Sequence, residues 1–143
     1  MTLHLLKLCV GVAEISELQY WIDRRAAEAV ARGEPPRHRH ITRQRPRRGD
    51  EVLDGGSLYW VIKGLIQVRQ RIVDLRDVTG EDGIRRCAII LAPTLVGTRP
   101  VPRRAFQGWR YLEAGDAPAD LGGDSVAALP AELRRELAGL GLL

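Results

Sequence analysis

Residues 36–48, PRHRHITRQRPRR, form the densest run of basic side chains in the chain. Side chains alternate along a strand, so on a strand the odd-numbered arginines of this run would share one face. They are Arg37, Arg39, Arg43, Arg45 and Arg47. A row of like charges is unfavourable unless an anion lies against it, so the run predicts phosphate contacts. The alternative is a solvated edge whose charges deter aggregation, and the run could be a strand or a flexible arm.

Residues 55–72, GGSLYWVIKGLIQVRQRI, combine aromatic, basic and amide side chains. The ligand-binding residues expected in this segment are Tyr59, Trp60, Lys63, Arg69 and Gln70. The rings would supply a stacking wall, and a buried Gln70 would need a hydrogen-bond partner, which a ligand could provide. Lys63 is the candidate catalytic residue, as an anion clamp or a deprotonated base. It draws attention because 20 of the 22 basic residues are arginine. The alternative is a central hairpin whose aromatic residues belong to the core.

Residues 99–112, RPVPRRAFQGWRYL, interleave basic and aromatic residues. The ligand-binding residues expected here are Arg103, Arg104, Gln107, Trp109 and Arg110. Surfaces that bind single-stranded nucleic acids use arginine for phosphates and aromatic rings for base stacking. A shared core beneath a sheet would explain the aromatic residues equally well.

The sequence favours neither a metal nor a cofactor. His38 and His40 would share one face of a strand, but only His4, Cys9 and Cys87 could complete a metal site. Glycine-rich phosphate loops are missing from the sequence. Both cysteines lie in apolar runs, where a reduced buried thiol is usual.

Length and composition limit the protein to one domain, residues 1–143. The chain has a mass of 15.9 kDa and contains 45% hydrophobic and 28% charged residues. This composition excludes disorder of the whole chain. It lacks an apolar run long enough to cross a membrane. Its N-terminal segment resembles a strand more than a signal peptide, so we expect a cytoplasmic protein. The net charge is +4, and the positive excess falls in residues 37–48 and 79–112, which suggests an anionic partner.

The apolar pattern predicts an α+β domain. Residues 3–10 have leucines on both faces, which is typical of a strand covered on both sides. A helix should begin at a capping box formed by Ser16 and Gln19 and end at Gly33. The basic arm 36–48, a central hairpin 57–91 and short strands after it would follow, and then an acidic tail, 113–143, with a helix that begins near Pro130. We therefore expect a curved antiparallel sheet or small barrel flanked by an N-terminal and a C-terminal helix.

Two resemblances accompany these patterns. At SLYWVIKGLIQVRQRI and RRAFQGWRYL the chain resembles a small family of bacterial proteins known only as a domain of unknown function, over nearly its whole length from MTLHLLKLCVG. A YWV strand with a nearby lysine and a basic cleft is also similar, in architecture, to the PUA-like barrels, including the ASCH and EVE groups. That second resemblance implies a PUA-like β-barrel that binds RNA or modified nucleobases; some of those proteins hydrolyse modified cytidines.

The leading hypothesis is a nucleic-acid or nucleotide-binding domain, with RNA or another phosphate-bearing ligand as partner. One alternative is a small hydrolase or transferase that acts on an anionic metabolite or modified nucleoside. Lys63 would then be the base or clamp, Arg69 or Arg110 the anion holder, and Asp54 or Asp74 the proton carrier. The other alternative is a protein–protein interaction module whose basic arm docks on an acidic protein. The sequence fixes neither the ligand nor the oligomeric state.

Overall fold

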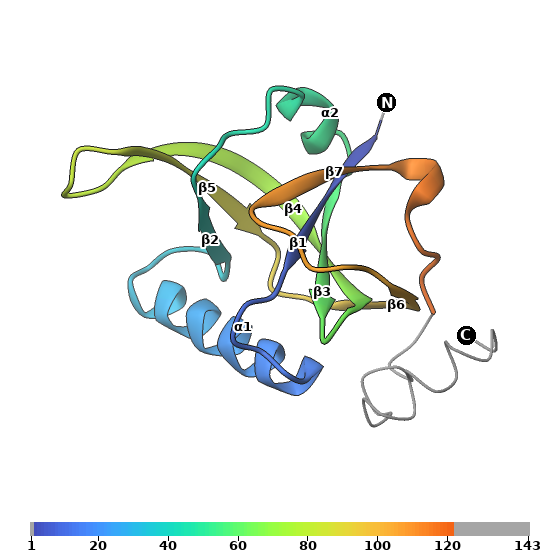
Figure 1. Cartoon of the computed structure of the whole chain (residues 1–143). Helices are drawn as coiled ribbons and strands as arrows, with labels where there is room; N and C mark the ends of the chain where they lie inside the picture. Colours follow the sequence, from blue (N-terminus) through green and yellow to red (C-terminus); the bar gives the residue numbers. More distant parts are fainter. Residues whose placement is uncertain (1, 122–143) are drawn as a thin grey trace.

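The computed structural model describes residues 2–121, so the expected C-terminal helix and most of the acidic tail 113–143 lie outside the described residues. Seven strands form one sheet: β1 (Leu3–Leu8), β2 (His38–Thr42), β3 (Ser57–Ile62), β4 (Leu65–Thr79), β5 (Arg85–Leu91), β6 (Val96–Pro102) and β7 (Trp109–Glu113) (Figure 1). The helices are α1 (Ile15–Ala31), α2 (Gly49–Leu53) and the 3-10 turn Ala114–Asp116. None of the helices in residues 2–121 has the length and apolar composition that a membrane crossing needs.

The sheet is mixed and is not closed into a barrel. Its strand order is β2-β5-β4-β3-β1-β7, and β6 pairs with β4. The expected purely antiparallel sheet is wrong at one pair, because β1 and β3 run parallel. Parallel neighbours need a long crossover, and the segment that carries α1, β2 and α2 supplies it. The α+β class is confirmed.

Strand β4 joins two parts of the sheet. Its first half lies between β3 and β6, and its second half pairs with β5. The predicted central hairpin 57–91 is therefore two hairpins that share β4. The first one turns at Lys63 and Gly64, and both residues have positive φ angles, as a tight two-residue hairpin turn requires. The second hairpin turns over residues 80–84 and projects beyond the rest of the sheet at the left of Figure 1.

Both faces of the sheet carry core residues. In β1, Leu3 and Leu5 join the larger apolar cluster and Leu6 joins the smaller one, so the predicted strand with two covered faces is confirmed. Helix α1 adds Leu18 and Ile22 to the larger cluster. The helix thereby covers one end of the core and places its polar side outward.

The ends of α1 follow the prediction only in part. The helix begins at Ile15, so the predicted capping box at Ser16 is wrong; instead, Glu17 Oε1 accepts a hydrogen bond from Ala13 N at 3.3 Å. At the other end Gly33 has a φ of 78° and donates to Val30 O at 2.9 Å, which is the predicted left-handed cap.

Side-chain contacts link β7 to the segment that follows β2. In a closed barrel, backbone hydrogen bonds would join these two edge strands. Trp109 Nε1 in β7 donates to Gln44 O at 2.9 Å, just beyond β2. The Tyr111 hydroxyl accepts from Arg48 N at 3.0 Å, and Arg48 also pairs with Glu113 at 3.3 Å. These contacts hold the segment after β2 against β7.

Gly56 provides a test of how closely α2, β1 and β3 approach. A Cβ atom at this position would collide with the carbonyl oxygens of Leu3 and Val52. We expect Gly56→Ala to lower the free energy of unfolding by about 3 kcal/mol or more, because rigid backbone must move. Gly115→Ala is the control, since a Cβ there meets nothing within 4 Å. Urea denaturation measures both, and equal stability of the two variants would contradict this packing.

Candidate functional site

The expected ligand-binding residues do not gather in one hollow. Trp60 and Gln70 lie in the interior, with exposed fractions of 2% and 0%. Trp60 Nε1 donates to Gln70 Oε1 at 2.9 Å, and Gln70 Nε2 donates to Ala92 O at 3.0 Å and lies 3.3 Å from His38 Nδ1. The protein itself thus supplies the partners that Gln70 was expected to find in a ligand. For Trp60, the interpretation as a core residue is the one the structure supports.

A second set lies on the opposite face of the sheet. Tyr59 is buried against His4, with ring centroids 5.1 Å apart, so it cannot form one stacking wall with Trp60. Arg69 forms two hydrogen bonds to the Asp120 carboxylate, at 2.8 and 2.7 Å, which hold the pKa of Asp120 below its usual range. Arg110 lies over the Phe106 ring at 5.2 Å and donates to two backbone carbonyls. These arginines are engaged within the protein.

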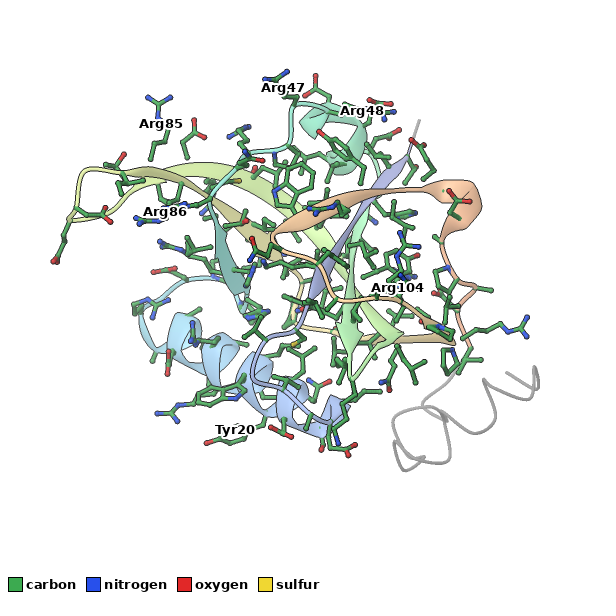
Figure 2. All side chains as sticks on the ribbon, viewed as in Figure 1. Tyr20, Arg47, Arg48, Arg85, Arg86 and Arg104 are labelled. Carbon is green, nitrogen blue, oxygen red and sulfur yellow. The ribbon has the colours of Figure 1, made fainter. Side chains whose placement is uncertain are left out.

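A third set is exposed and dispersed. Lys63 occupies the hairpin turn between β3 and β4 with a φ of 49°, which makes it an exposed turn residue. Arg43, Arg103, Arg104 and Gln107 are exposed in loops (Figure 2 labels Arg104). Arg45 pairs with Asp77 at 3.1 Å.

The carboxylates proposed as proton carriers are separated too. Asp74 pairs with Arg76 at 2.8 Å on β4, and Asp54 follows α2. Lys63, Asp74 and Asp54 thus lie on different elements: the turn between β3 and β4, the second half of β4 and the end of α2.

Two of the predicted residues, Arg37 and Arg39, do line a groove of about 910 Å³. One wall of the groove is the second half of α1, and the other comprises residues 34–41 and the outer face of β4 and β5. Alternation along β2 produces this placement, because His38 and Thr42 are buried while Arg39 and Ile41 are exposed. The predicted alternation is correct within β2, but the strand ends at Thr42, so the later arginines do not extend the row.

The helix supplies the other wall. Arg25, Glu28 and Arg32 recur at helical spacing, and all three line the groove. Arg25 and Arg32 were not among the residues predicted from the sequence, although their spacing along one side of the apolar stripe of α1 could have indicated them. Arg76, on β4, was missed because its position depends on strand pairing between distant segments.

Ion pairing divides the charges of the groove into two groups. Each acidic residue on its walls already has an arginine partner: Glu28 with Arg24 at 3.4 Å, Glu34 with Arg32 at 3.0 Å and Asp74 with Arg76 at 2.8 Å. Within residues 2–121, Arg25, Arg37 and Arg39 have no carboxylate within ion-pair distance. The floor contains the apolar side chains of Ile41, Val73 and Ile90. The groove thus offers three uncompensated guanidinium groups to an anion.

A different polar group lies inside the curved sheet. The His40 ring meets the Trp60 ring edge-on, with centroids 5.2 Å apart. Its Nε2 atom is buried and has no hydrogen-bond partner within the described part of the chain. Burial, the Lys7 charge and His38 together lower the pKa of His40 to about 4. The ring is therefore neutral at physiological pH. Nor do any three His, Cys, Asp or Glu residues in 2–121 form a group able to hold a metal ion.

Gln70→Leu tests the internal role of that amide. The substitution removes the acceptor of Trp60 Nε1 and the donor to Ala92 O, so we expect a loss of about 3 kcal/mol in the free energy of unfolding. Gln107→Leu, at an exposed loop position, should change it by less than about 0.5 kcal/mol. Chemical denaturation of both variants compares them, and an unchanged stability for Gln70→Leu would show that the network is dispensable.

His40 should make stability depend on pH. Its folded pKa of about 4 lies below the ordinary 6.5, so the unfolded chain binds the extra proton first as the pH falls. The contribution of the neutral His40 ring to the free energy of unfolding is complete above about pH 6.5. Roughly 2 kcal/mol of that contribution is lost when the pH falls to about 4.5. His40→Phe should therefore show a smaller loss than the wild type over the same range in urea titrations. Since acidic groups titrate equally in both proteins, parallel pH profiles would refute this assignment.

Comparison with known proteins yields one match. The family model described as Protein of unknown function (DUF1489) matches residues 5–143. No curated protein and no solved structure matches the chain. The family match spans the sheet, α1 and the groove together, and on this basis the chain belongs to the DUF1489 family of proteins of unknown function.

Proposed function

We propose that this protein binds a nucleic-acid strand, or a nucleotide, through phosphate contacts in the groove between α1 and the outer face of β2, β4 and β5. One observation carries the proposal: Arg25, Arg37 and Arg39 converge on a single groove without carboxylate partners among the described residues. Three guanidinium groups beside one another repel, and a bound anion relieves that repulsion. Their planar donors also match the geometry of phosphate oxygens.

The apolar floor strengthens the attraction. Ile41 and Val73 are each 38% exposed, so they offer apolar surface between the charged walls. A ligand seated there displaces water from both, and the lower local dielectric strengthens the contacts between guanidinium and phosphate. A sugar–phosphate strand has both features, because its phosphates are anionic and its sugar faces are partly apolar.

An exposed aromatic pair on α1 favours a strand over a single nucleotide. Trp21 lies one helical turn before Arg25 and is 43% exposed, next to Tyr20, which is 57% exposed (Figure 2). Their rings meet edge-on at 5.4 Å, and Arg24 lies 5.7 Å from the Trp21 ring centre. A base next to the phosphates in the groove could stack on this pair. The stacking wall expected at Tyr59, Trp60 and Trp109 is thus replaced by aromatic residues on the helix.

The phosphate contacts predict a particular dependence on salt. Contacts to three phosphates of a single strand give a slope of about −2 when log affinity is plotted against log salt concentration. A nucleic-acid ligand also accords with a cytoplasmic location, a bacterial origin and kinship with PUA-like domains, which stay predictions.

A matched pair of double variants tests the groove. We expect Arg37→Gln with Arg39→Gln to weaken binding of a labelled single-stranded RNA at least tenfold and to reduce the salt slope by more than half, because two phosphate contacts are lost. The control, Arg85→Gln with Arg104→Gln, changes the net charge equally at exposed positions outside the groove (Figure 2). Fluorescence anisotropy at two salt concentrations measures both, and the control should keep at least half of the affinity.

Two outcomes would overturn the proposal. Equal weakening by the two double variants would mean that only the overall charge attracts RNA. No binding of RNA or of a free nucleotide by the wild-type protein at low salt would remove the function altogether.

A further inference from the structure

A second set of polar groups, unrelated to the groove, lies on the inner face of the sheet. Lys7 follows Leu3 and Leu5 on the inward side of β1, and its register partners are Trp60 on β3 and Trp109 on β7. An ammonium group on this face is flanked by two tryptophan-bearing strands. The apolar neighbours of Lys7 in the sequence gave no sign of such a position.

The His40 ring lies on the same inner face of the sheet, next to Trp60. Its ring contacts Trp60 at 5.2 Å, and the Lys7 charge is among the causes that lower the pKa of His40. Trp109, the other neighbour of Lys7, is held by its hydrogen bond to Gln44 O and by an edge-on contact with Tyr111 at 4.9 Å. The lysine on β1 and the histidine on the edge strand β2 thus approach the Trp60 side of the curved sheet.

Neither group is satisfied by the protein. Lys7 makes no hydrogen bond or ion pair within residues 2–121, and burial lowers its pKa, opposed in part by the nearby Cys9 thiol. His40 Nε2 is buried and likewise without a partner in that range. Buried polar groups in native proteins are almost always paired, because each unpaired group costs free energy. The unpaired His40 Nε2 atom, with the Lys7 charge beside it, indicates a missing anionic partner.

We infer that Lys7 and His40 form a binding site for a small oxyanion, a phosphate or carboxylate group, beside the indole rings of Trp60 and Trp109. The anion would accept from the Lys7 ammonium and form the missing hydrogen bond with His40 Nε2. Lys7, His40 and Trp109 are each only partly buried, so each side chain keeps some contact with solvent. The inference does not depend on the groove, because Arg39 and His40 project from opposite faces of β2.

The lysine content of the chain makes the test selective. The sequence has only two lysines, Lys7 and Lys63, so isotope-labelled lysine gives two side-chain NMR signals, and Lys63→Arg assigns them. Inorganic phosphate and acetate are titrated separately into the wild-type protein, with chloride added to keep ionic strength constant. We expect the Lys7 signal to shift and saturate with at least one of them below about 50 mM, while the exposed Lys63 signal moves little. The anion should also raise the pKa of Lys7, because it stabilises the charged amine.

His40→Phe separates a built site from general charge attraction. This variant keeps an aromatic ring against Trp60 and removes the imidazole, so the anion should bind at least fivefold more weakly while the fold is retained. Parallel, unsaturated shifts of both lysine signals in the wild-type protein would overturn the inference, as would no shift at Lys7 with either anion. Since the main measurement uses the wild type, a poorly folded variant does not obscure the result. Loss of RNA binding in the groove variants would leave these titrations unchanged.

Discussion

The side-chain amide of Gln70 is the constraint on which the sheet depends. It lies where β4 exchanges β6 for β5, and it joins Trp60 on β3 to Ala92 in the link between β5 and β6. The start of β2 reaches the same amide through His38. Trp60 can only donate and a carbonyl can only accept, so the two ends of the amide have fixed roles. The amide thus helps to fix the first residue of β2, and the backbone ladder with β5 fixes the rest of that strand.

Strand β2 contributes polar side chains to both the interior of the sheet and the groove beside α1. Its even-numbered residues face the interior and its odd-numbered ones face α1, so consecutive residues contribute to different environments. Many arginines outside β2 form an ion pair with a nearby carboxylate, as Arg48 does with Glu51 at 2.6 Å. The high arginine content therefore supports internal ion pairs as well as an anion-binding surface. The groove differs from the rest of the described surface because Arg25, Arg37 and Arg39 on its walls take part in none of these ion pairs.

Patterns of local origin could be predicted from the sequence. The strand at residues 3–8 with two covered faces and the alternation at residues 38–42 depend on neighbours in the chain, and the structure contains both. The C-terminal cap at Gly33 belongs to the same class, because glycine has ready access to positive φ.

Features that depend on distant pairing could not be predicted. The Arg69–Asp120 ion pair joins residues that no periodicity connects, and it removes an arginine from the expected site. Lys63 resembled a functional residue because lysine is rare here, whereas it occupies a turn position with positive φ, which few residues other than glycine adopt. Lys7 was overlooked because its role arises only when β3 and β7 pair on either side of β1.

The position of β1 between β3 and β7 also affects how the chain folds during its synthesis. The leucine-rich strand β1 acquires its last neighbour only after residues 109–113 have been synthesised, so the nascent chain carries an unpaired apolar strand edge until then and offers it to chaperones.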